Sequence, residues 1–378
     1  MKIALVHDYL KEYGGAERVL SALCEIFPEA PIYTTFCLDN SSASKAFKDR
    51  QIIQSWFGKL PFSDKLISPL RFLLPLIWGS FDFSHYDLVI SSASWAVTKG
   101  FTQGKPKEIC YCHTPPRYLY GYETSRNWKK HWYIRFYAVI VNYFMRLYDF
   151  NQAQKVTWFI ANSREVQQRI KKFYRRESIV INPPVDLPKF KTHPANGRTK
   201  FKVKDYYLTG GRLEGAKNFE LIIEACNKIK VPLKIYGTGS REKYLRSIAG
   251  PTVEFLGRVS DEEKFELMSK GKAFIVAATD EDFGITPVEA MATGCPVIAF
   301  RGGGYLETVV EGSPRGFTLK GKTGIFFNEQ TVESLTKALR EFKDSEGKIK
   351  PEDCRKQAEK FSKERFKREI MNFVKSKF

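Results

Sequence analysis

The sequence is short of acidic residues and of long apolar runs. Its 42 Asp and Glu stand against 61 Lys and Arg, a formal net charge of +19 that is spread over both halves of the chain. This excess leaves nucleic acid, an anionic membrane and phosphorylated substrates as candidate partners, beside a general solubility charge. No run of about 18 uncharged apolar residues occurs, so a membrane-spanning helix is not expected.

Cysteines are few and scattered, and the amino terminus has no pattern typical of secretion. The chain has seven cysteines, an odd number, and the spacing Cys110-x-Cys112 fits neither a zinc knuckle nor a thioredoxin-type site. Reduced, buried thiols in a cytosolic protein are therefore expected. Met1–Asp8 resembles a first strand and lacks a basic stretch followed by a long apolar core, so no signal peptide is expected.

Short apolar runs alternate with helical patterns along the chain. Many of the runs are continuous, which is typical of parallel strands covered on both faces. A length of 378 residues is sufficient for two such domains, so we predict an α/β protein with two doubly wound parallel sheets. The expected strands are 2–7, 87–92, 108–112, 157–161, 178–182, 205–209, 232–236, 253–256, 272–278, 296–300 and 324–327.

Prolines and a polar stretch indicate where the first domain ends. Pro183, Pro184 and the residues 191–202 interrupt the pattern of strands and helices. We therefore expect an N-terminal domain over 1–190 and a C-terminal domain over 191–355. A charged helix over 356–378 could cross back to the N-terminal domain.

Two segments of the N-terminal domain are rich in aromatic residues. Residues 132–149 have the periodicity of an amphipathic helix, and 57–83 is a Phe-, Leu- and Trp-rich segment broken by prolines. The helix's apolar face holds Tyr133, Phe136, Tyr137, Ile140, Phe144, Leu147 and Tyr148, opposite Arg135, Asn142, Arg146 and Asp149. Either segment could pack in the domain core or rest on a membrane.

A glycine-rich loop with two cations follows the expected strand 205–209. Gly210-Gly-Arg-Leu-Glu-Gly-Ala-Lys-Asn218 leads into a helix for which Asn218 is a suitable N-cap. Arg212 and Lys217 therefore lie at the carboxyl edge of a sheet, near a helix N-terminus. Backbone amides, helix dipole and two cations together favour an anion such as a diphosphate. The alternative is a glycine turn with two solvated cations.

A weaker signal of the same kind follows the first strand. Gly14 and Gly15 precede a helix that carries apolar residues at helical spacing. The glycines do not have the spacing Gly-x-Gly-x-x-Gly, which gives no support to a nicotinamide site.

The segment from Phe274 to Gly294 contains two candidate acidic residues. Its strand ends near Thr279, which places Glu281 on the loop at the strand's carboxyl end, where ligands bind in α/β proteins. Phe283, Gly284 and Ile285 could direct backbone amides at a phosphate. Glu289 has two interpretations, because Thr286-x-x-Glu289 is also a capping-box sequence that needs no ligand. Asp280-x-Asp282 resembles a metal-binding pair, but the neighbouring cations already supply positive charge, and no metal is expected.

Two further loops follow strands, and their residue types alone do not decide whether either loop is structural or binds a ligand. His113-Thr-Pro-Pro-Arg117 comes after the strand 108–112, where a histidine is either structural or part of a site. Arg301-Gly-Gly-Gly304 comes after the strand 296–300, as a plain glycine-rich connection or as a ligand loop.

Together these motifs resemble the family 4 retaining glycosyltransferases. The resemblance rests on Gly-Gly-Arg-Leu-x-x-x-Lys-Asn, then Glu-x-Phe-Gly-x-x-x-x-Glu, with Gly-Gly-Ala-Glu near the amino terminus. It covers essentially the whole chain and is densest from 206 to 312. It implies the GT-B architecture, in which two Rossmann-like domains face each other across a cleft.

The resemblance also implies roles for individual residues. Arg212 and Lys217 would contact the donor diphosphate, and Glu281 the donor sugar hydroxyls. Glu289 would contact the nucleotide ribose. The backbone amides of Phe283, Gly284, Ile285 and Thr286 would bind the sugar and the phosphate. From the N-terminal domain, Gly14 and Gly15 would line the cleft and His113 would face the donor sugar.

The reaction implied is transfer of a hexose with retention of anomeric configuration, without metal or cofactor. His-Thr-Pro-x-Arg-Tyr-Leu, here from His113, is similar to O-antigen-type mannosyltransferases and favours GDP-mannose over a UDP-sugar as donor. The expected acceptor is a glycan or a polyprenyl-diphosphate-linked saccharide used in cell-surface polysaccharide synthesis. The positive charge then indicates a cytoplasmic protein that is peripheral on the anionic inner face of the plasma membrane.

Three other functions fit parts of the pattern. A sugar-nucleotide epimerase or a phosphorylase could share the fold, although no pyridoxal lysine signature is present for a glycogen-type phosphorylase. A nucleic-acid-binding protein would account for the charge, but no familiar reader motif occurs and the charge is not clustered. Nucleic acid is therefore not an expected partner.

Overall fold

The computed structural model describes residues 1–102, 105–124, 132–188, 205–311, 321–345 and 347–378. The chain forms two compact units. Unit 1 comprises Met1–Pro184 and Lys363–Phe378, and unit 2 comprises Val185–Ser362. The expected boundary at residue 190 falls in the segment 189–204, outside the described residues.

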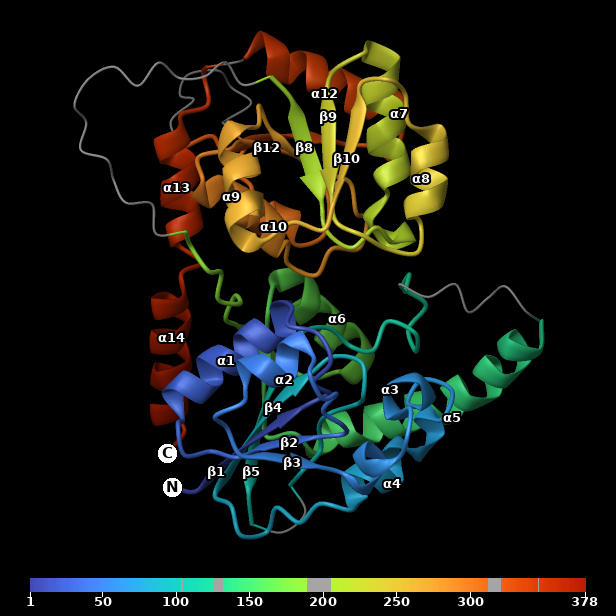
Figure 1. The fold of residues 1–378 in the computed structure, drawn as a ribbon. Helices are drawn as coiled ribbons and strands as arrows, with labels where there is room; N and C mark the ends of the chain where they lie inside the picture. Colours follow the sequence, from blue (N-terminus) through green and yellow to red (C-terminus); the bar gives the residue numbers. More distant parts are fainter. Residues whose placement is uncertain (103–104, 125–131, 189–204, 312–320, 346) are drawn as a thin grey trace. The chain divides into compact units, whose positions relative to one another are not determined.

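Unit 1 is built on a seven-stranded sheet whose strands pair in parallel, in the order β3-β2-β1-β4-β5-β6-β7 (Figure 1). The strands are β1 (Ile3–His7), β2 (Ile32–Thr34), β3 (Ile52–Gln54), β4 (Leu88–Ala93), β5 (Lys107–Cys112), β6 (Trp158–Ala161) and β7 (Ser178–Val180). The sequence analysis did not predict β2 and β3, whereas the equally short β7 and β11 were predicted because they lie within longer apolar runs.

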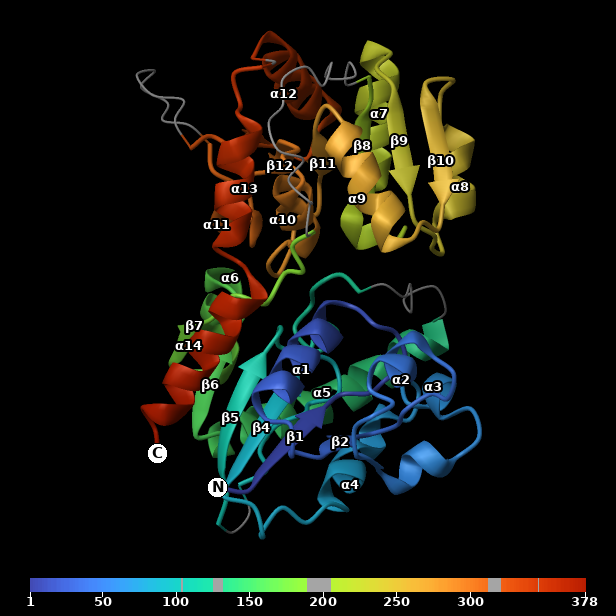
Figure 2. The same ribbon diagram turned by 60° about the vertical axis from the view of Figure 1, so that its left-hand side comes forward.

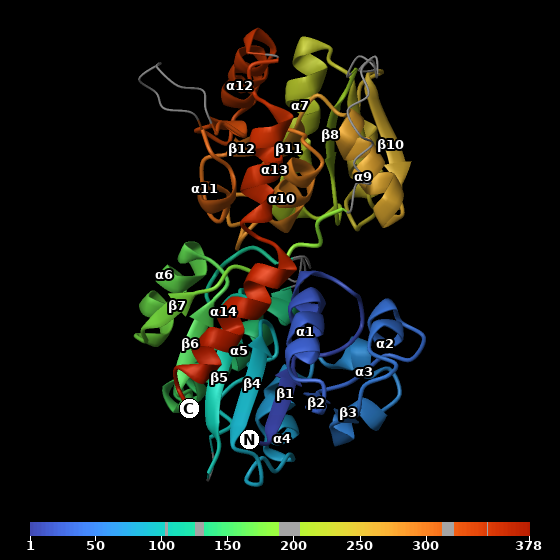
Figure 3. The same cartoon turned by 90° about the vertical axis from the view of Figure 1, so that its left-hand side faces the viewer.

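Helices cover both faces of this sheet. They are α1 (Gly15–Ile26), α2 (Ser42–Ala46), α3 (Ser63–Leu66), α4 (Leu74–Gly79), α5 (Trp132–Lys155), α6 (Arg164–Tyr174) and α14 (Lys363–Lys375), with 3₁₀ turns η1 (Trp56–Lys59) and η2 (Arg71–Leu73). On one face α1 and α14 lie side by side (Figure 3), and they share an apolar core with Leu5, Ile90 and Tyr111. On the other face Val6 and Val89 pack with residues of α4 and α5.

Helix α5 leaves most of its expected apolar face exposed, contrary to what this periodicity suggests for a globular protein. Asn142 and Asp149, from the expected polar face, are buried, whereas Phe136 and Phe144 are 66% and 63% exposed. The buried polar groups have partners: Asn142 accepts a hydrogen bond from Nε of Arg71 at 3.0 Å, and Asp149 forms a buried ion pair with Lys99. Polar partners therefore hold the helix on unit 1, and the aromatic face is left exposed.

The carboxyl-terminal segment differs from the single helix expected over 356–378. It forms α13 (Pro351–Glu359) in unit 2 and α14 in unit 1, separated by the residues 360–362. At this break Phe361 is buried, and its carbonyl accepts a hydrogen bond from the Val185 amide at 2.9 Å. The break lets α13 pack in unit 2 while Phe366, Ile370 and Val374 of α14 enter the core of unit 1.

Unit 2 repeats the doubly wound plan with six parallel strands in the order β10-β9-β8-β11-β12-β13. The strands are β8 (Tyr207–Gly210), β9 (Leu233–Tyr236), β10 (Val253–Gly257), β11 (Phe274–Val276), β12 (Val297–Phe300) and β13 (Gly324–Phe327). The remaining helices are α7 (Phe219–Ile229), α8 (Glu242–Ile248), α9 (Asp261–Lys270), α10 (Ile285–Ala292), α11 (Tyr305–Thr308) and α12 (Val332–Asp344), with the 3₁₀ turn η4 (Gly215–Lys217). The predicted α/β class with two parallel sheets is confirmed.

The helices of unit 2 form two layers. Helices α7 and α12 pack together on one side of the sheet, and α9, α10 and α13 lie on the other (Figure 2). The strand order reverses between β8 and β11, so the loops after these two strands leave the sheet side by side. In doubly wound sheets this is the place where ligands bind.

Candidate active site

The loop after β8 is held by close backbone contacts that only glycines allow. Gly211 has φ +129° and Gly237, after β9, has φ +110°. A Cβ on Gly237 would lie 1.8 Å from the Gly211 carbonyl oxygen, so a side chain cannot fit there. Asn218 is the N-cap of α7 as predicted, but its side chain does not cap the helix. Its amide instead donates to Oε1 of Gln330 at 2.6 Å.

Lys217 and Glu281, predicted separately, are direct partners. Nζ of Lys217 lies 2.6 Å from Oε2 of Glu281, and the hydroxyl of Tyr305 donates to the same oxygen at 3.2 Å. The Lys217 side chain is 42% exposed and that of Glu281 16% exposed. Because an ammonium has three N–H groups, Lys217 can bind Glu281 and an anion from solvent together.

A pocket surrounds this cluster at the carboxyl edge of the sheet. Its lining consists of Thr209, Gly210, Lys217, Phe219, Ile222, Val276, Ala277, Glu281, Gly284, Thr286, Pro287 and Tyr305. Arg212 is in the same loop as Lys217 but is not part of the lining. Its side chain is exposed and, within the described residues, has no ion-pair or hydrogen-bond partner. The guanidinium is therefore available to an anion at the pocket edge.

Helix α10 begins beside the same pocket. Its N-cap is Gly284, with φ +89°, and no side chain caps the first turn. The first-turn amides of Ile285 and Thr286 therefore lack a side-chain cap and carry the positive end of the helix dipole. The Phe283 ring is buried against Phe361, so only the backbone of Phe283 could reach a ligand.

The glycine-rich loop after β12 supports the loop that carries Glu281. The Gly304 amide donates to the Glu281 carbonyl at 2.8 Å. A Cβ on Gly304 would lie 2.3 Å from Cα of Phe283, and one on Gly303 would lie 2.5 Å from the Glu281 carbonyl oxygen. These glycines are thus needed for backbone packing behind the site, which favours the structural interpretation of Arg301–Gly304.

Glu289 is not a helix cap. Helix α10 begins at Ile285, so Thr286 lies inside the helix and the capping-box interpretation is wrong. The Glu289 side chain is 6% exposed, and its Oε1 accepts a hydrogen bond from Nζ of Lys264 at 3.0 Å. Lys264 lies on α9 and also reaches Oδ1 of Asp261 at 2.8 Å. Glu289 is therefore a buried, paired carboxylate next to the predicted donor-binding loop.

Gly14 and Gly15, the candidates from the first glycine pair, start helix α1. Gly14 is the N-cap of α1, and its amide donates to Oε2 of Glu17 at 2.8 Å. Glu17 therefore occupies one amide of this helix terminus with its own carboxylate.

In the same unit, His113 follows β5 and is 9% exposed. Its Nε2 lies 2.8 Å from Oγ of Ser92. Burial and, to a smaller extent, the nearby His7 lower the pKa of His113 to about 3.

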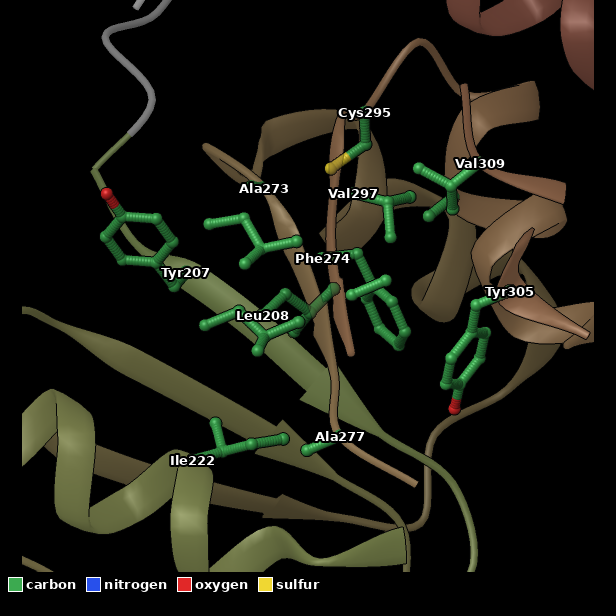
Figure 4. Close-up of a cluster of buried hydrophobic side chains, with 14 of the residues drawn as sticks. Tyr207, Leu208, Ile222, Ala273, Phe274, Ala277, Cys295, Val297, Tyr305 and Val309 are labelled. Carbon is green, nitrogen blue, oxygen red and sulfur yellow. The ribbon is translucent and has the colours of Figure 1, made fainter. Parts of the chain in front are cut away.

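Sequence reasoning did not identify Tyr305 or Lys264. Tyr305 follows the three glycines, and nothing in its sequence context indicates that its ring lies beside Phe274 with the hydroxyl directed away from the apolar cluster (Figure 4). Lys264 lies in a charged helix, 25 residues before its partner Glu289. No local pattern connects residues at that separation.

No group of three or more His, Cys, Asp or Glu side chains among the described residues is arranged to hold a metal ion. No helix within the described ranges has the length and apolar character needed to cross a membrane.

Comparisons with protein families match both units. The profile described as Glycosyltransferase Family 4 matches residues 13–189, and the profile described as Glycosyl transferases group 1 matches residues 195–361. A GtfA subunit of UDP-N-acetylglucosamine–peptide N-acetylglucosaminyltransferase from Streptococcus pneumoniae is 25% identical over 46% of this chain, a match that spans only 36% of that relative. Alpha-1,3/1,6-mannosyltransferase ALG2 from Candida glabrata is 24% identical over 82% of this chain and 78% of its own.

A solved structure has the same fold over the full length. The structure of Anabaena HepE in complex with UDP and glucose covers 100% of both chains with a TM-score of 0.71 and 19% identity. At this identity the likeness concerns the fold.

Proposed function

The chain belongs to the family 4 (group 1) glycosyltransferases, which are retaining enzymes with nucleotide-sugar donors, and on this premise we propose that it transfers mannose from GDP-mannose to a lipid-linked saccharide. The observation that carries the proposal is the cluster of Lys217, Glu281 and Tyr305 beside the uncapped first turn of α10. Cation, carboxylate and free amides at one sheet edge match a diphosphate joined to a sugar.

The proposed chemistry assigns a task to each side of the pocket. Arg212 and Lys217 stabilise the negative charge that develops on the departing diphosphate, a role that needs no metal. The amides of Ile285 and Thr286 bind phosphate and sugar oxygens. Glu281, held by Lys217 and Tyr305, accepts hydrogen bonds from sugar hydroxyls, because a carboxylate is an acceptor only.

The remaining roles follow from the family resemblance. Glu289, which also binds Lys264, would accept hydrogen bonds from the ribose hydroxyls. His113 would contact the donor sugar. The acceptor hydroxyl attacks from the face that the diphosphate leaves, and the leaving diphosphate takes its proton, which retains the configuration. This route requires no pair of catalytic carboxylates of the glycosidase kind.

Mannose is proposed because of the sequence His113-Thr-Pro-Pro-Arg117 and the likeness to a relative named as a mannosyltransferase over 82% of this chain. A UDP-sugar is the second candidate, favoured by the fold likeness to a structure that contains UDP and glucose. An epimerase would convert a nucleotide sugar without any acceptor, which separates it from both.

The direct test offers labelled GDP-mannose or UDP-glucose together with a polyprenyl-diphosphate-linked monosaccharide in detergent. We expect α-linked product from GDP-mannose, and a rate roughly 10²–10³ lower for Arg212→Ala. Arg340→Ala, an exposed arginine on α12, is the matched control and should retain the wild-type rate. Product from UDP-glucose alone would replace mannose in the proposal. Product from neither donor, or full activity of Arg212→Ala, would contradict it.

A membrane surface is the proposed location of the acceptor. The two aromatic-rich segments of unit 1 expose large apolar side chains, among them Phe62, Phe72, Leu76, Trp132, Tyr133, Phe136, Val139, Ile140, Tyr143, Phe144 and Leu147. Exposed basic side chains lie on the same segments, at Lys59, Lys65, Arg135 and Arg146. Aromatic side chains with cations nearby favour an anionic lipid interface, since the rings enter the headgroup region and the cations attract the lipid charge.

Co-sedimentation with vesicles tests this location. We expect binding to phosphatidylglycerol vesicles that is stronger than to phosphatidylcholine vesicles and weakens with salt. Replacing Phe136 and Phe144 by Ser should lower the partition coefficient roughly 100-fold or more, because each buried Phe contributes roughly 1.5–3 kcal/mol. Tyr244→Ser, at an aromatic residue of unit 2 that is 47% exposed, should not change it. Equal, negligible sedimentation with both vesicle types would contradict the proposal.

A further inference from the structure

A buried chain of hydrogen bonds leads from His113 to the first turn of helix α1. Nε2 of His113 lies 2.8 Å from Oγ of Ser92, and the same oxygen lies 3.0 Å from Nδ1 of His7. The other nitrogen of His7, Nε2, lies 3.4 Å from Oε1 of Glu17. His113 directly follows β5, and the other three side chains come from β4, β1 and α1; β1, β4 and β5 are neighbouring strands of the sheet.

The ionisation of Glu17 decides which group donates and which accepts in each of these hydrogen bonds. Burial would raise the pKa of Glu17, but its interactions with His7 and the hydrogen bonds from the amides of Glu17 and Gly14 outweigh this effect, so the pKa is lowered. An ionised carboxylate only accepts hydrogen bonds, so Nε2 of His7 carries a proton. In neutral His7 the nitrogen Nδ1 is then an acceptor, and Ser92 donates its hydroxyl proton to it.

The same order of donors and acceptors continues to His113. Once the Ser92 hydroxyl donates to His7, its oxygen is left to accept, and only an Nε2–H of His113 can donate to it. The low pKa of His113 keeps its imidazole neutral, so a proton on Nε2 leaves none on Nδ1. Within the described residues, Nδ1 of His113 has no hydrogen-bond partner.

We propose that Glu17, His7 and Ser92 are positioning residues that hold His113 as its Nε2–H tautomer, so that Nδ1 accepts a hydrogen bond from a substrate hydroxyl. The proposal rests on the proposed function for the identity of that hydroxyl, and on unit 1 alone for the tautomer. It also gives Glu17 of the Gly-Gly-Ala-Glu sequence a task away from the donor phosphates: Glu17 binds Gly14 with one oxygen and orients His7 with the other.

The groups that face His113 are few. His7 and Glu17 act on its charge, and the ring of Tyr111 lies 5.2 Å from it, edge to face. A protonated His7 would donate from both nitrogens and reverse the Ser92 hydroxyl, which would place the His113 proton on Nδ1. The tautomer is therefore measured at about pH 8, above the ordinary pKa of a histidine near 6.5.

Nitrogen-15 NMR of histidine-labelled protein reads the tautomer directly. The chain has five histidines, and a His113→Asn variant assigns the signal of His113 by its disappearance. We expect the wild-type protein to show Nε2 protonated and Nδ1 bare. A proton on Nδ1 at about pH 8 would overturn the proposal.

Substitution of Ser92 interrupts the series of hydrogen bonds between His113 and His7. In Ser92→Ala the signal of His113 should change to a mixture of tautomers, with kcat lower on the order of tenfold and the donor KM nearly unchanged. Ser91→Ala is the matched control, because Ser91 is equally buried on β4 but its hydroxyl donates to Glu108 at 2.6 Å. The control should keep the wild-type tautomer even if the loss of that bond destabilises the fold.

A second variant covers the case in which Ser92→Ala does not fold. Glu17→Gln introduces an amide that can donate to Nε2 of His7, so the proton of His113 should become distributed over both nitrogens. A wild-type tautomer in a folded Ser92→Ala or Glu17→Gln protein would overturn the proposal. The predicted tautomer in a protein without transferase activity would instead contradict only the proposed function.

Discussion

Two lysine–glutamate pairs lie on and beside helix α10, and they differ in their access to water. Lys217 and Glu281 are 42% and 16% exposed, with their charged atoms 2.6 Å apart. Lys264 and Glu289 are 10% and 6% exposed, with a separation of 3.0 Å. The first pair lines the pocket, whereas neither member of the second pair is part of the lining.

The difference indicates what each pair does. An exposed ion pair contributes little to stability, so its members can exchange partners with a ligand at small cost. A buried pair is costly to break, because either member alone would be an uncompensated charge in the interior. We therefore assign the exposed pair to the chemistry, and the buried pair to holding α9 against α10, which keeps Glu289 in place for the proposed ribose contact.

The largest expected effect is on catalysis at the exposed pair. Lys217→Met should lower kcat roughly 10²–10³-fold, because it removes a cation aimed at the leaving diphosphate. Its effect on the free energy of unfolding should stay within about 1 kcal/mol. Lys228→Met is the control, since Lys228 is 49% exposed and pairs with Glu333 at the same 2.6 Å. Wild-type turnover of Lys217→Met would contradict the assignment of Lys217 to the active site.

The same substitution at the buried pair should act on stability. Lys264→Met leaves Glu289 buried without its cation and should lower the free energy of unfolding by about 3 kcal/mol. Urea unfolding followed by circular dichroism measures this, while tryptophan fluorescence reports unit 1, because all six tryptophans precede Pro184. A second change, Glu289→Leu, should restore most of the loss. A Lys264→Met protein as stable as wild type would contradict the comparison.

A smaller effect is expected behind the exposed pair. Gly304→Ala forces a methyl group to within 2.3 Å of Cα of Phe283, a backbone atom that cannot move alone. The loop that carries Glu281 must shift, with a loss of about 1–3 kcal/mol in stability and a lower kcat. Gly215→Ala, where no atom lies within 4 Å of the added Cβ, should leave both nearly unchanged. Equal thermal midpoints for the two variants would count against this packing.

The smallest expected effect concerns Tyr305. Tyr305→Phe removes the hydroxyl that donates to Glu281 at 3.2 Å and should lower kcat about two- to tenfold, which corresponds to one hydrogen bond of roughly 0.5–1.5 kcal/mol. Tyr206→Phe removes a comparable bond to the Leu267 carbonyl, at 2.9 Å in the same unit, and is the control. Identical steady-state constants for both variants would exclude Tyr305 from orienting Glu281.

The exposed pair could be anticipated from sequence, and the buried pair could not. Lys217 and Glu281 follow buried strands that a doubly wound order places side by side, so topology alone brings their loops to one edge. Lys264 and Glu289 meet across two helices, and their contact depends on how α9 and α10 pack. The capping-box interpretation of Glu289 failed because a Thr286 cap requires α10 to begin at Pro287, whereas it begins two residues earlier, at Ile285.

The fold shows a similar division. Strands that lie in longer apolar runs, such as β4 and β12, were predicted close to their observed bounds, whereas the short β2 and β3 were not predicted. The periodicity of α5 indicated two faces but not which face is buried. Arg71 and Lys99 bind Asn142 and Asp149 from distant segments, and these contacts decide the orientation.

A thermal-shift panel of GDP, GDP-mannose, UDP and UDP-glucose on the wild-type and Lys217→Met proteins tests the central claim most directly. At about 100 times its dissociation constant a bound ligand stabilises by roughly 2.7 kcal/mol, which raises the melting temperature measurably. The account predicts a rise with GDP-mannose for the wild-type protein and a much smaller rise for Lys217→Met at the same concentration. No rise with any nucleotide or nucleotide sugar, or an equal rise in both proteins, would contradict it.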